Sequence, residues 1–250
     1  MLFRSPGFDR IIALESNASS SYHGLAMQVN KRLLHNFQFL AAYTLGKVID
    51  DRPEPFALNP GTNAEALLLS DPSNPRADRG PGALDARHRF VLSGIWDLNY
   101  ADRLRGVAKV TLGGWELSGI LTVQSGFPHD GLVSFDLNND GNPFSDRTPG
   151  QSRNTFRLPV TVSLDPRVTR NVRIAERVRL QLVWEAFNVF NRANISGVRT
   201  TQYSRSSSIT VCGIAGTPCL VPQNTGATAF GTPAATSGPR IMQLAIKLVF

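Results

Sequence analysis

The sequence contains no run of apolar residues that approaches the roughly 18 needed for a membrane-spanning helix. Such a chain can cross a membrane only as a β-barrel, because hydrocarbon leaves the polar groups of open sheet edges unsatisfied. The first residues, Met1–Gly7, also lack the apolar stretch and the small-residue cleavage site of an export signal. For an exported protein, the simplest interpretation is that these 250 residues are the carboxyl-terminal part of a longer chain.

Cysteine and histidine are scarce. Cys212 and Cys219 are the only cysteines and fall in one predicted loop, so a disulfide in an oxidising exterior is favoured, with two free thiols as the alternative. Their spacing does not fit the paired zinc patterns, and the histidines show no metal-ligand spacing. We predict structural or surface roles for His23, His35, His88 and His129.

Motifs of common enzymes are also missing. The chain has neither a Gly-rich phosphate-binding loop nor the pattern of a nucleophile elbow. A catalytic triad assembled from distant residues stays open, but the sequence favours a protein that is not an enzyme, with no catalytic or cofactor-binding residues to assign. The net charge of +7 permits an anionic partner without requiring one, since nucleic acid, lipopolysaccharide and anionic substrates all fit.

A regular alternation of apolar and polar residues is present instead. In the closing stretch, Arg240–Phe250, every second residue is apolar and the chain ends on an aromatic, which is typical of the last strand of bacterial outer-membrane barrels. Assembly machinery recognises such strands. Similar alternation, with one weak candidate at Arg10–Asn17, predicts further strands at residues 22–31, 37–47, 87–98, 115–124, 160–169 and 178–187.

The connections between these segments alternate between short and long. The links near 33–36 and 175–177 are tight and the one at 99–114 is of medium length, whereas the connections at 48–86, 126–159 and 191–238 are long and rich in Pro, Gly and Asn. Transmembrane barrels place short turns on the periplasmic side and long loops outside. The sequence therefore predicts an all-β fold: a portion of an antiparallel transmembrane β-barrel with about eight strands, long extracellular loops and short periplasmic turns.

Aromatic residues support this arrangement. Five aromatic residues occupy alternating apolar positions near the predicted turn end, as in the aromatic belt at a membrane interface. They are Phe37, Phe39, Trp96, Trp115 and Phe250. On the same face, Arg170 is expected to extend its stem toward the interface. Pro166 removes a hydrogen-bond donor from its strand, so we expect a bulge or an early strand end there.

Two polar clusters allow more than one interpretation. Asp136, Asn138 and Asp140 match the first half of a calcium-binding EF-hand loop, but Arg147 occupies the position of the bidentate Glu, so an Asx-rich turn is the alternative. The arginines near Pro166 could form a nucleic-acid-binding helix, but Pro159 and Pro166 oppose a helix. Strand parity instead places Arg167, Arg173 and Arg179 in the barrel interior near Asp165 and Glu185, and we predict no nucleic-acid partner.

Several short sequence segments, which we call phrases, resemble the carboxyl-terminal barrel of TonB-dependent receptors. The resemblance is in particular to the Oar-like type with an amino-terminal carboxypeptidase-regulatory-like domain. The resemblance runs from about Ser20 to Phe250 and keeps the phrases in order. They are Ser20–Leu25, Phe39–Lys47, Asp85–Val91, Gly114–Gly119, Gln124–Pro128 and Glu185–Asn191.

The resemblance implies a barrel of about twenty-two strands around a plug that TonB pulls from the periplasm. Neither a plug nor a TonB box is found in residues 1–250, so we expect one segment of such a receptor in a Gram-negative outer membrane. Implied partners are outer-membrane lipid and lipopolysaccharide, the barrel-assembly machinery through the strand ending at Phe250, and the TonB system through the plug. The alternatives are a small self-closing barrel with an adhesive or structural role and a soluble β-sandwich binding module.

Overall fold

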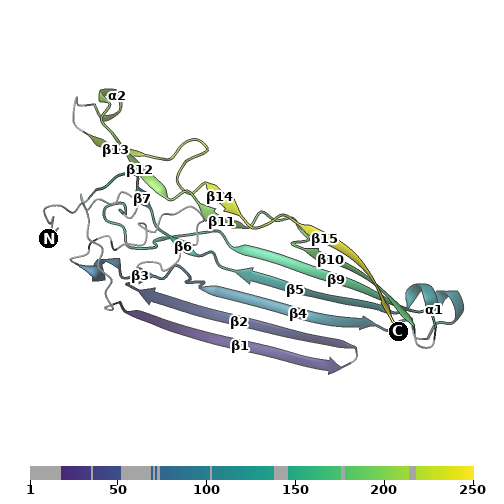
Figure 1. Ribbon diagram of the computed structural model, residues 1–250. Helices are drawn as coiled ribbons and strands as arrows, with labels where there is room; N and C mark the ends of the chain where they lie inside the picture. The colour runs from purple at the N-terminus through teal and green to yellow at the C-terminus, as the bar shows by residue number, and fades with distance from the viewer. Residues whose placement is uncertain are drawn as a thin grey trace.

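The computed structural model describes residues 18–34, 36–51, 69, 71, 74–101, 103–137, 146–175, 178–213 and 218–250. Its main feature is an eight-stranded antiparallel sheet, made of seven long strands and the two-residue β3 (Gly80–Pro81), which pairs with β2 (Figure 1). The long strands lie side by side in chain order: β1 (Ser20–Leu34), β2 (Phe37–Asp50), β4 (His88–Leu98), β5 (Trp115–Gln124), β9 (Thr161–Arg173), β10 (Arg179–Phe187) and β15 (Ile241–Val249). The predicted all-β fold is confirmed. The weak candidate at Arg10–Asn17 lies outside the described residues.

The strand register gathers the predicted apolar positions on one face of the sheet. Directly paired residues of antiparallel strands point to the same face. One row of partners is apolar across six strands: Phe37, Trp96, Leu117, Val168, Trp184 and Leu244. The neighbouring row on the opposite face is mainly polar: Gln38, Ile95, Ser118, Arg167, Glu185 and Gln243. We call these the apolar face and the polar face.

Short and long connections leave from opposite ends of the sheet, as predicted (Figure 1). At the turn end, Asn36 joins β1 to β2 with a positive φ of 64°, and backbone hydrogen bonds between Ala175 and Val178 close the turn from β9 to β10. The β4–β5 link at the same end contains the helix α1 (Gly106–Leu112). The three long connections leave from the opposite, loop end.

The long connections contain short elements that their polar composition did not predict. The 3-10 helix η2 (Pro75–Asp78) precedes β3. Three small sheets pair β6 (Pro128–His129) with β8 (Phe156–Arg157), β11 (Ile195–Val198) with β14 (Pro233–Thr236), and β12 (Thr201–Ser206) with both β7 (Leu132–Val133) and β13 (Cys219–Pro222). Helix α2 (Ile209–Cys212) lies between β12 and β13. These elements and the segments around them form what we call the loop layer.

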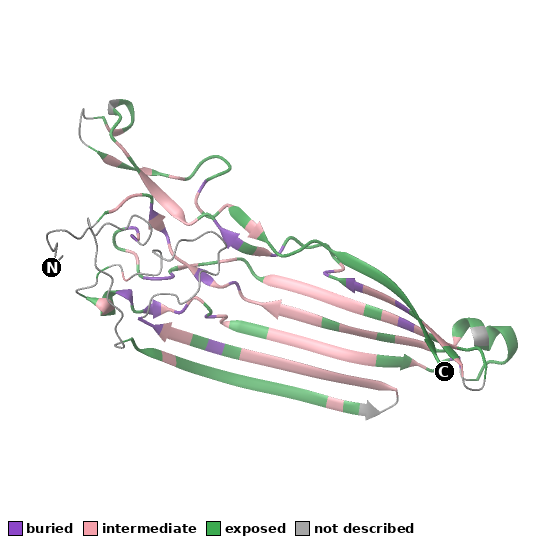
Figure 2. Cartoon of the chain, in the orientation of Figure 1, coloured by how far each residue is buried: buried purple, intermediate pink, exposed green. Residues whose placement is uncertain are grey.

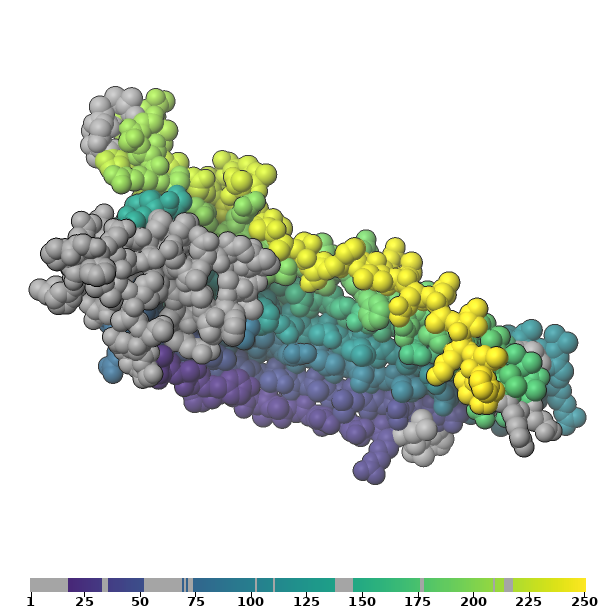
Figure 3. Space-filling model, viewed as in Figure 1, coloured from purple at the N-terminus to yellow at the C-terminus, as the bar shows by residue number. Residues whose placement is uncertain are grey.

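The two outer strands of the large sheet remain apart. β1 and β15 each pair with one neighbour among the described residues, and they follow opposite edges of the sheet in Figure 3. Every residue of β15 is exposed, including Leu244 at 82% and Ile246 at 76% (Figure 2). Over the described residues, the sheet is therefore an open, curved wall whose two edge strands have no second partner. No helix in the described part of the chain is long and apolar enough to cross a membrane.

The bulge or early strand end predicted at Pro166 is wrong. β9 neither bulges nor ends there, because its pairing with β5 continues without a register shift from Gln124–Thr161 to Trp115–Arg170. Pairing with β10 instead stops at Arg167 and Glu185, one residue before Pro166. The missing N–H of proline thus coincides with the end of the ladder on the β10 side, so β9 runs on as a strand of the sheet.

The aromatic residues gather at the turn end of the apolar face, as predicted. The ring of Phe37 lies 5.7 Å from that of Phe39 and 6.5 Å from that of Trp96 between centroids. Trp115 pairs with Leu98 at the same end. Phe250 follows Val249, which pairs with Arg179 near the β9–β10 turn. A membrane-interface depth for this group, which we call the aromatic belt, stays a prediction.

Candidate functional site on the polar face and in the loop layer

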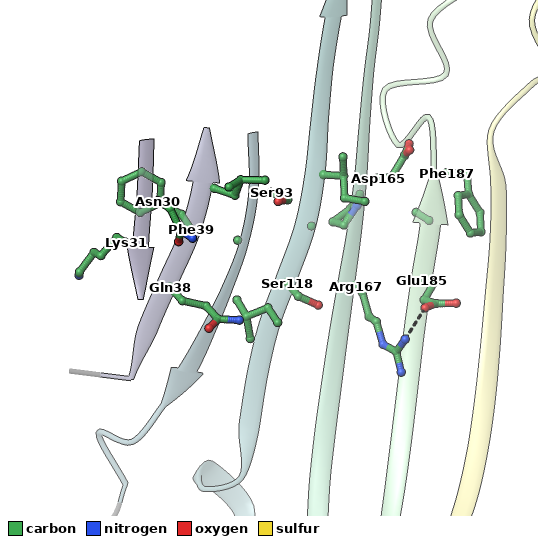
Figure 4. Close-up of a pocket in the computed structure, with 17 residues that line it drawn as sticks. Asn30, Lys31, Gln38, Phe39, Ser93, Ser118, Asp165, Arg167, Glu185 and Phe187 are labelled. Atoms are coloured by element: carbon green, nitrogen blue, oxygen red, sulfur yellow. Dashed lines mark ion pairs between the residues drawn. The ribbon is translucent and has the colours of Figure 1, made fainter. Parts of the chain in front are cut away.

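The polar face forms a trough of about 600 Å³ across the middle of the sheet. Residues of β1, β2, β4, β5, β9 and β10 line it, including Asn30, Gln38, Ser118 and Asp165 (Figure 4). Apolar side chains such as Ile95 and Ile120 share the surface with amides, hydroxyls and charges. A surface of this kind suits a water-filled interior better than a dry protein core.

The charges in the trough are paired more selectively than the sequence predicted. Arg167 Nη1 lies 3.0 Å from Glu185 Oε1, which confirms that contact. Asp165 instead accepts hydrogen bonds from the Ser163 hydroxyl at 2.7 Å and from the Asn188 backbone N–H at 2.8 Å. Arg173 and Arg179 do lie on the polar face. They are direct cross-strand partners at the turn end, away from Asp165 and Glu185. Their predicted place beside Asp165 and Glu185 is wrong, since both arginines lie several residues along the strands from these carboxylates.

Ion pairs of buried carboxylates join the end of β2 and the first long connection to the second long connection. Asp50 pairs with Arg153, and only 5% of each side chain is exposed. Asp78 pairs with Arg147, and Asp85 pairs with Arg157. Buried charges are stable only when paired and hydrogen-bonded, so these contacts fix the loop layer onto the sheet.

Asp85 is the most deeply buried of these carboxylates, with 1% of the residue exposed. Its Oδ1 accepts the backbone N–H of Val48 at 2.7 Å. Its backbone carbonyl accepts a hydrogen bond from Arg157 Nη1 at 2.7 Å, and Arg87 Nη2 lies 3.5 Å from Oδ2. Asp85 thus connects β2, the entry to β4 and β8.

The second and third long connections also touch each other. The Phe156 ring packs edge-on against Phe230, with centroids 4.9 Å apart, and stacks with His129 at 5.7 Å. Gln202 Oε1 accepts hydrogen bonds from Thr148 Oγ1 and Gln151 Nε2, both at 2.9 Å. Over the described residues, the second and third connections are therefore in direct contact, through an aromatic cluster and the hydrogen-bonded amide of Gln202.

The third connection carries an arm that stands away from the rest of the loop layer (Figure 1). β12 and β13 form its antiparallel ladder, in which Ser206 pairs with Cys219. A disulfide joins Cys212 to Cys219, with Cα atoms 5.5 Å apart and seven residues of separation. The predicted disulfide is confirmed in the structure, and it closes the tip of the arm.

Comparison with known families matches residues 2–152 and 148–243 to a family described as an outer membrane beta barrel domain. The chain belongs to this family. No curated protein matches the chain. In an outer-membrane barrel domain with long extracellular loops, we expect the apolar face to contact lipid and the polar face to line the barrel interior, with the loop layer on the extracellular side. The match also opposes the soluble sandwich, whose apolar face would need a second sheet to cover it.

The possible calcium loop of this barrel domain is only partly visible. Asn138 and Asp140 lie outside the described residues, while Asp136 lies before the gap. Arg147, which occupies the position of the bidentate Glu, forms its ion pair with Asp78. Among the residues that are described, no group of three or more His, Cys, Asp or Glu side chains could hold a metal ion. Calcium binding stays a prediction for this segment.

Asp130, in the loop layer, provides a test of how tightly that layer packs. Burial raises the pKa of the Asp130 carboxyl above its ordinary value of 3.8, although Asn154, Arg147 and Arg153 oppose the shift. Because the folded protein holds this proton more tightly than the unfolded chain, the contribution of Asp130 to stability is complete below pH 3.8 and is lost as the pH rises through the folded pKa.

We expect Asp130→Asn to raise the unfolding midpoint at pH 7 and to lose that advantage on acidification toward pH 3.8. The amide oxygen can still accept the Asn154 N–H, so the change removes the charge and keeps the hydrogen bond. Urea unfolding of both proteins over a series of pH values measures the difference. A stability gain that grows as the pH falls would contradict the stated sign.

Proposed function

We propose that the chain forms part of the wall and the external loops of a TonB-dependent receptor, which takes up a large or scarce nutrient across the outer membrane. The chain would act by shaping the entrance and interior of the barrel. In this proposal it has no catalytic role and binds no nucleic acid. Its partners would be outer-membrane lipid, lipopolysaccharide, the barrel-assembly machinery and, through a plug domain, TonB.

The open sheet is the observation that carries this proposal. A barrel of about eight strands closes with an interior that its own side chains fill. Here the outer strands β1 and β15 do not meet, and the polar face is a trough instead of a filled core. A wall that is still open after seven long strands fits a barrel of much larger circumference, wide enough to hold a plug.

Two of the phrases that resemble TonB-dependent receptors contain residues with specific structural contacts. In Gln124–Pro128, a side chain at Gly126 would collide with the backbone carbonyl of Leu158. In Asp85–Val91, Asp85 holds the buried ion pair, and the Ser125 hydroxyl accepts the backbone N–H of His88 at 2.9 Å. These two phrases therefore lie where the sheet meets the loop layer, which supports a shared architecture.

The wide-barrel proposal can be tested by cross-linking the sheet edges. Cysteines would replace Met27 on β1 and, one at a time, Met242, Leu244 and Ile246 on β15, in protein oxidised within its own outer membrane. A wide barrel predicts no intramolecular bond for any pair, because other strands separate β1 from β15. Efficient bonding of one pair would instead establish the small self-closing barrel.

The transport role needs a separate experiment. Loss of the gene should abolish uptake of one nutrient, and removal of TonB should have the same effect in the complemented strain. The genomic reading frame upstream of Met1 should encode an in-frame plug domain and an export signal. Uptake that continues without TonB would refute the receptor proposal and leave the outer-membrane assignment intact.

A further inference from the structure

Helix α1 is an exposed apolar element at the turn end of the sheet (Figures 1 and 2). It is seven residues long and has no side-chain hydrogen bond at its N-cap, Arg105. Its exposed residues include Val107 at 79% and Leu112 at 47%. Helices this short are not stable through their own backbone hydrogen bonds, so α1 requires a surface on which to rest.

Arg170 places the carboxyl end of α1 beside the lipid-facing side of the wall. Arg170 belongs to the apolar face, where it pairs with Trp115 across the β5–β9 ladder. Its guanidinium lies over the Trp115 ring, 4.7 Å from the centroid, and its Nη1 donates to the backbone carbonyl of Thr111 in α1. The arginine thus lies at the turn end and the helix lies next to the aromatic belt, while a membrane interface at this end stays a prediction.

The charges around α1 are predominantly positive. The β4–β5 link contains Arg103, Arg105 and Lys109 against the single carboxylate of Asp102, and Arg170 adds a further cation beside it. Arg103, Arg105 and Lys109 are all exposed. Segments that lie at a membrane interface combine exposed apolar residues with cations, as this link does.

We propose that α1 and its preceding arginines form an interfacial anchor that binds the phosphate headgroups of anionic phospholipid in the periplasmic leaflet. Val107 and Leu112 would enter the boundary between headgroups and acyl chains, and the cations would contact the phosphates. Each cation near an anionic bilayer strengthens such an association about fivefold. This inference rests on the outer-membrane placement of the barrel domain and is independent of any transported nutrient.

The test uses a fluorescent label at Val107→Cys, since both native cysteines are consumed by the disulfide. The protein is purified from the outer membrane and placed in nanodiscs of phosphatidylcholine with or without phosphatidylglycerol. We expect neutral acrylamide to quench the label severalfold less in the anionic discs. Removing the cations with Arg103→Gln, Arg105→Gln and Lys109→Gln should abolish that difference.

A matched control removes the same charge from the loop layer through Arg76→Gln, Arg199→Gln and Arg205→Gln, all of which change exposed side chains. This control should keep the protection at Val107. Inorganic phosphate added to phosphatidylcholine discs should give no protection, which separates lipid from a free anion. Equal quenching in both kinds of disc, or loss of protection in the control, would overturn the anchor.

Discussion

Asp85→Ala is expected to destabilise the protein by about 3 kcal/mol, the lower end of the range for breaking a buried ion pair. The substitution removes the acceptor of the Val48 N–H and leaves Arg157 without its carboxylate. The lower end applies because 31% of the Arg157 side chain is exposed, so its guanidinium can turn toward water. Urea unfolding followed by tryptophan fluorescence would measure the loss.

Two further variants separate charge from packing at this position. Asp85→Asn keeps an acceptor for Val48 and should be less harmful than Asp85→Ala. The double variant Asp85→Ala, Arg157→Ala removes both charges and should recover part of the stability, because no buried cation remains unpaired. Asp97→Ala, at an exposed position of β4, is the control and should be close to neutral. An Asp85→Ala effect no larger than this control would contradict the buried network.

Leu121→Arg is expected to destabilise the folded protein in a bilayer by about 2–4 kcal/mol, as arginine does near the midplane of a barrel wall. Leu121 lies near the middle of β5 on the apolar face, between Leu92 and Leu164. The adjacent Thr122 lies on the polar face between Val91 and Ser163. Thr122→Arg is therefore the matched control, because its charge would enter the polar interior.

The measurement compares the free energies of unfolding of both variants in the same lipid. A larger loss for Thr122→Arg than for Leu121→Arg would reverse the two faces. That outcome would remove the physical basis for a membrane wall, since the alternation along β5 would then point its polar residues toward hydrocarbon.

The long strands and their faces could be predicted from the sequence because alternation is a local property. In β15, Leu244, Ile246 and Leu248 mark one face without reference to any other strand. The disulfide was predictable for a similar reason, since Cys212 and Cys219 lie in one loop. The course of the chain at Pro166 was not, because its effect depends on where the neighbouring ladder ends.

The contacts of the loop layer could not be predicted from one sequence. Asp85 and Arg157 are 72 residues apart, and Asp78 and Arg147 are 69 residues apart. Nothing in either local sequence specifies its partner, since each long connection contains several candidate charges. The short strands were missed because two to six residues carry too little alternation to distinguish them from irregular loops.

The ion pair between Asp50 and Arg153 has a consequence for the order of folding. Each long strand pairs with its predecessor in the chain, so the wall can grow one hairpin at a time as each segment arrives. Asp50, however, ends the second strand and meets a partner that follows 103 residues later. Closure of so large a loop is slow compared with hairpin formation. We therefore expect the loop layer to fold last, in one cooperative step that completes folding of the domain at the cell surface.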